Sequence, residues 1–235
     1  MQGRGEGETG RRGDDAEPET AEPSERTVDG DVERQGKRNE DSNAVAERPP
    51  VSPPPRLPFA PSTEIERRAA GVKLLLLDCD GVLTDGRITL VEGGDERKSF
   101  HTRDGHGLVL LHRAGLRSGI ISGRRSRLVA LRAADLGVAY VRQGALDKLE
   151  VFEELLEEAG VAPSEVAYVG DDVVDIPLMR RCGLAVAVAD ATEDTRASAH
   201  YVTRLPGGFG AVREVCELIL KAQGRWAELM KRYTG

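Results

Sequence analysis

Residues 74–83 read LLLLDCDGVL: four leucines lead directly into two aspartates, Asp78 and Asp80, separated by one cysteine. A short continuous apolar run is typical of a parallel strand that is buried on both faces. The carboxylates come where such a strand would leave the sheet, and Gly81 permits a sharp turn there. The stretch therefore predicts a central strand of an α/β sheet whose carboxyl end carries acidic groups.

Residues 64–235 alternate short apolar runs with amphipathic segments, as parallel sheets covered on both faces do. We therefore expect a three-layer α/β sandwich with a central parallel sheet. Segments 87–91 and 96–100 predict a small β-hairpin flap, and no insertion is long enough for a large cap domain. The expected strands are 72–78, 116–122, 138–141, 165–172, 184–190 and 201–204, and the expected helices are 106–113, 126–137 with Gly137 as its stop, 148–160, 176–183, 192–199 and 210–224, followed by a turn over 225–233.

The N-terminal part of the chain has a different composition. Residues 1–56 contain no Phe, Tyr, Trp or Ile, and residues 1–50 carry 8 Lys and Arg against 14 Asp and Glu. Such a segment buries too little apolar surface to offset the entropy of ordering it. We predict that residues 1–63 form a disordered acidic and proline-rich extension and that residues 64–235 form one domain.

The charge and the apolar pattern exclude several classes of partner. The extension carries most of the net charge of −7, so the rest of the chain offers no basic surplus for nucleic acid. No apolar run approaches the roughly 20 residues that span a bilayer, and no signal peptide is recognisable. The three cysteines are widely spaced, without a CxxC pair. We expect a cytoplasmic protein that binds neither nucleic acid nor membranes.

Polar residues follow four of the expected strands. Open α/β sheets bind ligands outside the carboxyl ends of their strands, so these side chains should meet at one edge. Asp78 and Asp80 would alternate onto one side of an extended segment, where a hard cation such as Mg²⁺ would balance them. The other groups are Ser122 with Gly123, the lone Lys148, and Asp171, Asp172 and Asp175 in the stretch GDDVVD.

Each of these features alone also has a purely structural explanation. Asp175 would suit the cap of a helix that starts at Ile176, and Ser122 is a favoured helix cap as well. Lys148 at a helix start is unfavourable for the helix dipole unless an anion lies beside it. The four features in this order are far more specific than any one of them, and together they favour an anion site beside clustered carboxylates.

The ordered set DCDGVLTDG, IISG, a lone lysine and GDDVVD resembles the haloacid dehalogenase superfamily of phosphohydrolases. Within this superfamily, about residues 68–224 resemble the family of 3-deoxy-D-manno-octulosonate 8-phosphate phosphatases. The stretches that carry this resemblance are RDGHG, YVGDDVVDIPLM, GLAVAVADA and GGFGAVREVCELIL. The resemblance implies a Rossmann-like fold. It also implies a Mg²⁺-dependent phosphomonoester hydrolase of lipopolysaccharide sugar biosynthesis.

The resemblance further implies how the reaction would be divided among the residues. Asp78 would be the nucleophile that forms an aspartyl phosphate, and Asp80 the general acid and then the general base. Ser122, the Gly123 amide and Lys148 would bind the phosphoryl oxygens.

The same resemblance implies the metal site. Mg²⁺ would be held by the Asp78 side chain, the Asp80 backbone carbonyl and Asp171. Asp172 and Asp175 would order the waters of the ion.

The substrate contacts and the assembly are also carried over from the resemblance. Arg103, Asp104 and Gly105 would face the sugar acid. The chain would form a homotetramer in which the hairpins pack together and a neighbouring subunit helps to close the site.

Other functions stay open at this point. Phe209, in GGFG, stands where the family often has Arg, so the substrate could be another sugar acid such as a nonulosonate 9-phosphate. A non-catalytic tetramerisation module is a second alternative, disfavoured because the acids, the serine and the lysine are all present. A two-component receiver domain is a third, disfavoured because segment 138–144 ends without the aspartate that would accept phosphate.

Overall fold

The computed structural model describes residues 62–93 and 96–234. The predicted disordered extension therefore lies outside the described residues, except for positions 62 and 63. The predicted parallel sheet is confirmed, with its six strands side by side and all neighbouring pairs parallel. In spatial order the strands are β5 (Tyr140–Gln143), β4 (Arg117–Ser122), β1 (Leu74–Leu77), β6 (Val166–Gly170), β7 (Leu184–Ala187) and β8 (Tyr201–Val202).

The four leucines form the central strand β1, as predicted. Each is fully buried, and β1 pairs with β4 on one side and β6 on the other. Gly119 on β4 lies opposite Leu76, and a Cβ there would approach the Leu76 side chain to 2.7 Å. Because β4, β1 and β6 are adjacent and parallel, the residues that follow them emerge at the same edge of the sheet.

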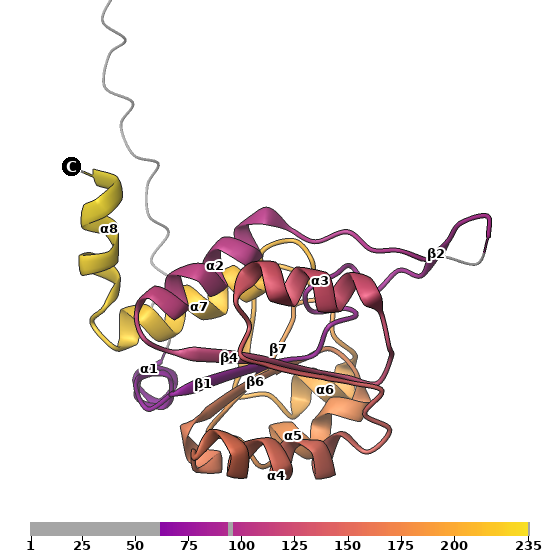
Figure 1. Ribbon diagram of the computed structural model, residues 1–235. Helices are drawn as coiled ribbons and strands as arrows, with labels where there is room; N and C mark the ends of the chain where they lie inside the picture. Colours follow the sequence, from indigo (N-terminus) through magenta and orange to yellow (C-terminus); the bar gives the residue numbers. More distant parts are fainter. Residues whose placement is uncertain (1–61, 94–95, 235) are drawn as a thin grey trace, which may run out of the picture. The chain divides into compact units, whose positions relative to one another are not determined.

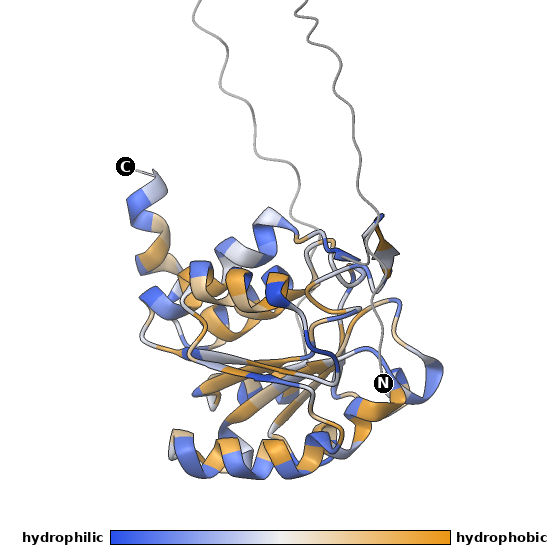
Figure 2. Ribbon diagram, turned by 45° about the vertical axis from the view of Figure 1, so that its right-hand side comes forward, coloured by the Kyte–Doolittle hydropathy of each residue, from blue (hydrophilic) through white to orange (hydrophobic). Residues whose placement is uncertain are grey.

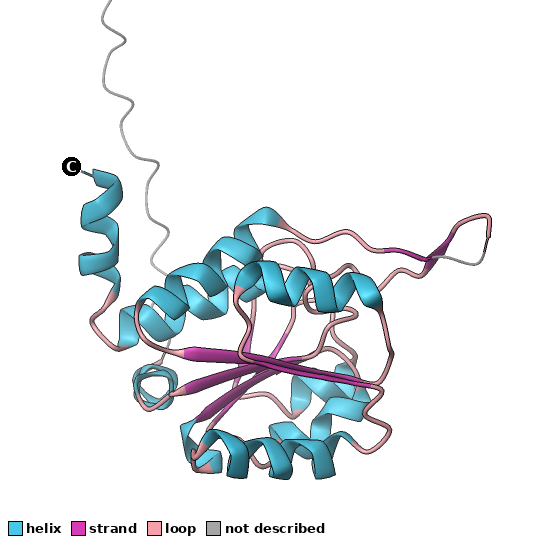
Figure 3. Cartoon of the chain, in the orientation of Figure 1, coloured by secondary structure: helices cyan, strands magenta, loops and turns pink. Residues whose placement is uncertain are grey.

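Helices cover both faces of this sheet (Figures 1 and 3). Apolar residues line the sheet and the inward sides of the helices, while hydrophilic residues cover the outward sides (Figure 2). One layer holds α2 (Thr102–Arg113), α3 (Arg127–Leu136) and α7 (Ala211–Ala222), with α1 (Thr63–Ala70) packed against α7. The other holds α4 (Lys148–Ala159), α5 (Ile176–Met179) and α6 (Glu193–Ala197). Two 3₁₀ turns lie between α4 and α5 in the sequence: η1 (Pro163–Glu165) comes before β6, and η2 (Val173–Asp175) comes after it.

The helix ends follow from local sequence. Gly137 ends α3 in the left-handed conformation, at φ 70°, as predicted, and Gly160 does the same for α4 at φ 63°. The Asp147 side chain caps the start of α4 by accepting from the N–H groups of Leu149 and Glu150. None of the helices in residues 62–93 and 96–234 is long and apolar enough to cross a lipid bilayer.

Several elements differ from the expectation. Helix α2 begins at Thr102 instead of His106, and α5 ends at Met179 instead of Gly183. Helix α1 has no counterpart in the sequence prediction, although Ile65 and Ala69 give it a buried face. The segment expected as a final turn is a helix, α8 (Trp226–Thr234), because its apolar residues recur at helical spacing against α7. The hairpin is confirmed but shorter: β2 (Thr89–Leu90) pairs antiparallel with β3 (Glu96–Arg97).

Replacing Leu76 by Ala tests the central place of β1. We expect Leu76→Ala to lower the free energy of unfolding by about 2–5 kcal/mol, because a fully buried leucine leaves a cavity that close-packed strands cannot fill. Urea denaturation measures the change. Leu131→Ala, on α3 and 54% exposed, is the control and should change stability by no more than about 0.5 kcal/mol. Equal losses in both variants would contradict the assignment of β1 as the core strand.

Candidate active site

Asp78 is the first residue after the central strand. Its backbone N–H donates to the Val169 carbonyl on β6 at 2.9 Å, so the carboxylate starts from a fixed position at the sheet edge. The chain then turns at once: the N–H groups of Leu83 and Thr84 both donate to the Cys79 carbonyl. Gly81, at φ 91°, provides the predicted sharp turn.

The two aspartates of the motif have different partners. We expected Asp78 and Asp80 on one side of an extended segment; the segment is not extended, because the strand ends at Leu77 and the chain turns at Gly81. The Asp80 carboxylate is bound by Lys98, which follows β3, and its other oxygen lies 3.7 Å from Arg124 Nε. The Lys98 side chain is only 3% exposed, whereas the Asp80 side chain keeps 22% of its surface exposed.

Asp171 and Asp175 come from the segment after β6. Together with Asp78 they form a cluster in which one oxygen of each carboxylate lies within 4.8 Å of the others. Glycines make this approach possible: a Cβ on Gly81 would lie 2.0 Å from Asp171 Oδ2, and a Cβ on Gly170 would lie 2.5 Å from the Cβ of Asp175. The two motifs therefore meet because each contains a glycine at the point of contact.

Asp175 is fully buried and has four hydrogen-bond donors. Oδ1 accepts from Lys148 Nζ and from the Tyr168 hydroxyl, both at 2.7 Å, and Oδ2 accepts from the N–H groups of Asp171 at 3.0 Å and Asp172 at 3.3 Å. These contacts occupy the acceptor positions that a carboxylate has. Asp175 lies in the acid cluster, but Asp78 and Asp171 are better suited to hold an ion.

The structure also corrects the helix-cap interpretation of Asp175. It occupies the position before α5, but its side chain makes no bond to that helix and folds back onto the preceding turn. Asp172 is exposed and caps η2, with Oδ1 accepting from the Val173 N–H at 2.8 Å.

Lys148 is the first residue of α4 and supplies the cation of the site. Its Nζ lies 2.9 Å from Asp78 Oδ1 and 2.7 Å from Asp175 Oδ1. Burial opposes the charge of Lys148, but the attraction of Asp78 and Asp175 outweighs it and raises the lysine pKa. The expectation that an anion lies beside this lysine is met by two carboxylates.

The acid cluster has an excess of negative charge even with Lys148. Burial raises the pKa of Asp78 to about 6, although the nearby Lys148 opposes the shift. Burial, with the charges of Asp78 and Asp175, raises the pKa of Asp171 to about 8. The carboxylates of this cluster cannot all be ionised unless a cation offsets their charge. Because all of their donor atoms are oxygens, the cluster suits a hard dication.

Ser122 lies at the carboxyl end of β4, 3% exposed, and its Oγ accepts from the Arg124 N–H at 3.3 Å. The helix expected over 126–137 is confirmed as α3, which begins at Arg127 with Ser126 at its N-cap position, so Ser122 does not cap a helix. Gly123 is exposed beside Ser122. This loop therefore offers a hydroxyl and backbone groups next to the acid cluster, but no helix terminus at Ser122.

The segment GGFG packs directly on the turn that follows Asp78. The Gly208 N–H donates to the Val82 carbonyl at 2.9 Å, and a Cβ on Gly207 would lie 1.6 Å from the Gly81 carbonyl oxygen. Phe209 is 55% exposed. The two glycines thus support the turn, while the side chain at position 209 faces solvent.

Two of the three predicted sugar contacts need correction. Asp104 is 1% exposed, and its oxygens accept from the N–H groups of Gly210 at 3.1 Å and Arg213 at 2.7 Å, so it joins α2 to the start of α7. Gly105 is buried, and a Cβ there would lie 2.2 Å from Arg132 Nη2. Arg103 is exposed.

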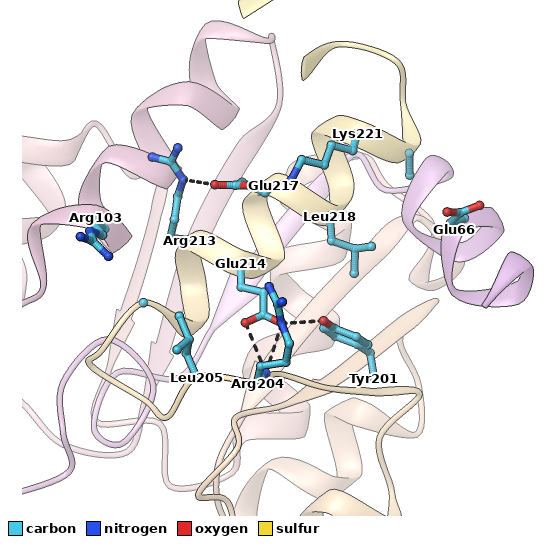
Figure 4. A pocket seen from close by; sticks show the side chains of 12 residues that line it. Glu66, Arg103, Tyr201, Arg204, Leu205, Arg213, Glu214, Glu217, Leu218 and Lys221 are labelled. Atoms are coloured by element: carbon cyan, nitrogen blue, oxygen red, sulfur yellow. Dashed lines mark hydrogen bonds and ion pairs between the residues drawn. The ribbon is translucent and has the colours of Figure 1, made fainter. Parts of the chain in front are cut away.

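Arg103 lines a separate cavity of about 910 Å³ (Figure 4). Its walls come from α1, α2, β8 and α7, and none of them belongs to the acid cluster. Several of its charged groups pair with one another: Glu217 bridges Arg213 and Lys221, and Glu214 pairs with Arg204. The clustered carboxylates and the buried lysine therefore lie at the sheet edge and not in this cavity.

Sequence reasoning identified Lys148 but missed three other partners of the site acids. Tyr168 could have been found, because a tyrosine inside a fully buried strand needs a partner for its hydroxyl. Lys98 and Arg124 gave no comparable signal, since their contacts with Asp80 depend on how the hairpin folds over the sheet edge.

The geometry suits attack on a phosphoryl group. A buried carboxylate, Asp78, is held beside a lysine, a hydroxyl and a cluster able to bind a dication, while a second carboxylate, Asp80, stands in a separate, more solvated position. Two carboxylates in different environments can serve as nucleophile and as proton carrier.

Comparisons with known proteins agree with this arrangement. A family model described as haloacid dehalogenase-like hydrolase matches residues 134–207. The 3-deoxy-D-manno-octulosonate 8-phosphate phosphatase KdsC of Escherichia coli K12 is 47% identical over 167 residues, which cover 71% of this chain and 89% of that protein.

Solved structures give the same result. The phosphatase of the same name from Yersinia pestis is 47% identical, with a TM-score of 0.69 over 70% of this chain and 89% of the other. The one from Moraxella catarrhalis, described in complex with magnesium ion, phosphate ion and KDO molecule, is 41% identical, with a TM-score of 0.72 over 74% of this chain and 99% of the other. The chain therefore belongs to the 3-deoxy-D-manno-octulosonate 8-phosphate phosphatase family of the haloacid dehalogenase-like hydrolases.

Proposed function

We propose that this chain is a Mg²⁺-dependent phosphatase that releases phosphate from 3-deoxy-D-manno-octulosonate 8-phosphate. The observation that carries the proposal is the position of Lys148 Nζ, within 2.9 Å of Asp78 and 2.7 Å of Asp175 at the sheet edge of a member of this family. The relative from Moraxella catarrhalis, with magnesium, phosphate and KDO in its crystal, supports the substrate and the metal.

In the proposed reaction an Asp78 oxygen attacks phosphorus, and the bond between phosphorus and the sugar oxygen breaks. Asp80 gives its proton to the departing oxygen. Asp80 then takes a proton from a water that attacks the aspartyl phosphate, and phosphate leaves as the Asp78 carboxylate is restored. Lys148 and Ser122, with the Gly123 amide, would bind the phosphoryl oxygens and stabilise the charge that builds up on them.

The Asp78 side chain, the Asp80 carbonyl and Asp171 would hold Mg²⁺. When bound, the ion would offset the negative charges of the carboxylates and the phosphoryl group, so that they can approach one another. Asp172, which is exposed, would order water of the ion. The four donors to Asp175 favour a different role for that residue, as the anchor of Lys148.

We also propose the outer contacts, the assembly and the location. Arg103 would contact the sugar acid only from outside the acid cluster, since it is exposed on the first turn of α2 and lines the separate cavity. Exposed Ile88 and Leu90 near the hairpin support a homotetramer joined through the hairpins. Three buried free cysteines support a reducing compartment such as the cytoplasm. The catalytic domain would be residues 64–235, with residues 1–63 as its extension.

The substrate is tested by phosphate release from two sugar-acid phosphates. We expect kcat/KM on 3-deoxy-D-manno-octulosonate 8-phosphate to exceed that on a nonulosonate 9-phosphate by at least about tenfold, because a site built to bind one set of hydroxyls discriminates against another. Chelation of the metal should stop turnover on both, and added Mg²⁺ should restore it.

Equal rates on the two substrates would favour the alternative of a broader sugar-acid phosphatase. The observation behind that alternative is Phe209, whose exposed ring replaces an arginine common in the family. Activity that persists in chelator would contradict the metal-dependent mechanism.

Replacing Asp78 by Asn tests the nucleophile. We expect phosphate release to fall below detection, because the amide cannot form the aspartyl phosphate. Light scattering should give four chains per particle for the parent and for Asp78→Asn. Glu154→Gln, the same acid-to-amide change on the exposed side of α4, is the control and should keep full activity. Undiminished activity of Asp78→Asn would refute the nucleophile assignment.

The charge excess of the acid cluster predicts a pH effect on stability. Without metal, the folded chain keeps a proton on Asp171 up to about pH 8, while the unfolded chain releases it near its ordinary value of about 4. The folded state binds more protons between these values, so its stability should fall as the pH rises through this window. Mg²⁺ should remove the penalty, and its stabilising effect should be largest near pH 8.

Thermal melts in chelator and in Mg²⁺, from about pH 5 to about pH 8, measure this effect. Asp171→Asn is the matched control: it lacks the group, so its melting temperature in chelator should fall less over the same range. His106, His112 and His200, whose pKa values are lowered by burial, act in the opposite direction but equally in both proteins. Identical pH profiles of parent and variant would contradict the prediction.

A further inference from the structure

Tyr168 lies in the middle of β6, between β1 and β7, opposite Leu76 and Ala185. It is fully buried, and its hydroxyl donates to Asp175 Oδ1 at 2.7 Å. The proposed reaction assigns no role to this residue. Its neighbours on the central strands hold it rigidly, so the position of its hydroxyl is set by the sheet.

Tyr168 and Gly170 lie two positions apart on β6, so they share one face of the sheet. Gly170 has no side chain there, and the space admits Asp175, whose Cβ would be 2.5 Å from a Cβ at position 170. Tyr168 supplies a donor to the carboxylate that enters this space. The strand thus provides both the room and the hydrogen bond for Asp175.

The oxygen that Tyr168 binds is also the oxygen that Lys148 binds. Lys148 in turn divides its charge between Asp175 at 2.7 Å and Asp78 at 2.9 Å. The Tyr168 hydroxyl occupies part of the acceptor capacity of Asp175 Oδ1 and so competes with the ammonium group for that oxygen. Without that hydroxyl, Lys148 would be drawn toward Asp175 and away from Asp78.

We propose that Tyr168 is a positioning residue for phosphoryl transfer: its hydroxyl fixes Asp175 and thereby keeps Lys148 Nζ between Asp175 and the reacting Asp78. The inference rests on the proposed function and extends it to a residue that touches neither substrate nor metal. Tyr168 acts on the reaction only through Lys148.

Tyr168→Phe removes the hydroxyl and keeps the ring that fills the core. We expect kcat to fall about tenfold with KM changed less than about twofold, because a displaced lysine stabilises the transition state less but leaves sugar binding intact. Orthovanadate, which mimics the phosphoryl group in the transition state of its transfer, should inhibit the variant about tenfold more weakly. An inhibition constant does not depend on the amount of active enzyme, so partial unfolding cannot imitate this effect.

Tyr201→Phe is the matched control. Tyr201 is also buried and also donates to a carboxylate, Glu214 Oε1 at 2.6 Å, but it lines the separate cavity away from the acid cluster. We expect its kcat and its vanadate inhibition to match those of the parent. A similar loss in both tyrosine variants would show a general effect of buried hydroxyls on stability and would overturn the proposal.

A double-mutant cycle with Lys148→Met tests whether the effect passes through the lysine. In that background Tyr168→Phe should cause no further change in residual kcat/KM or in vanadate affinity, the latter measured by thermal shift. Losses that multiply would overturn the proposal. If the parent releases phosphate and Tyr168→Phe has the same kcat, this inference alone is overturned. If the parent releases no phosphate, the proposed function is overturned, and this inference with it.

Discussion

The ammonium group of Lys148, shared between Asp78 and Asp175, is the interaction on which the catalytic edge depends. Both carboxylates are buried, so without the lysine two negative charges would face each other away from water. Removing one partner of a buried ion pair typically costs about 3–5 kcal/mol. The same cation stands beside the proposed nucleophile, where it would reduce the repulsion between a carboxylate and a phosphate dianion. The ammonium group of Lys148 therefore contributes both to the stability of the fold and to the proposed reaction.

The sheet brings this group and its partners together. Asp78, Ser122 and Asp171 lie at the carboxyl ends of three adjacent strands, so parallel pairing fixes their backbones at one edge of the sheet. Close contact then requires glycine at positions 81 and 170, because a Cβ at either position would overlap the neighbouring acid. The glycines in the two aspartate motifs thus serve tertiary packing as well as turning the chain.

The hairpin gives the two aspartates of the first motif different surroundings. Asp78 faces inward to Lys148, whereas Asp80 is bound by Lys98 from the base of the hairpin and approached by Arg124 from the loop after β4. Separate environments let two identical side chains take different parts in one reaction. Of the described hairpin residues, Lys98 is thus tied to the catalytic edge, while Ile88 and Leu90 stay exposed.

Local patterns in the sequence were enough to predict the central strand, the helix stop at Gly137, the hairpin and the acids at the sheet edge, because apolar continuity and glycine act within a few residues. The order of the four motifs was enough to predict the family. The folded chain was needed to show that Asp80 pairs with Lys98, that Asp104 is buried against α7, and that Tyr168 and Lys148 meet on one oxygen of Asp175. It was also needed to show that residues 63–70 and 226–234 are helices packed on the core. Asp104 meets Arg213 across 109 positions and Lys148 meets Asp175 across 27. Such contacts depend on which elements pack side by side, and no local pattern in the chain encodes that.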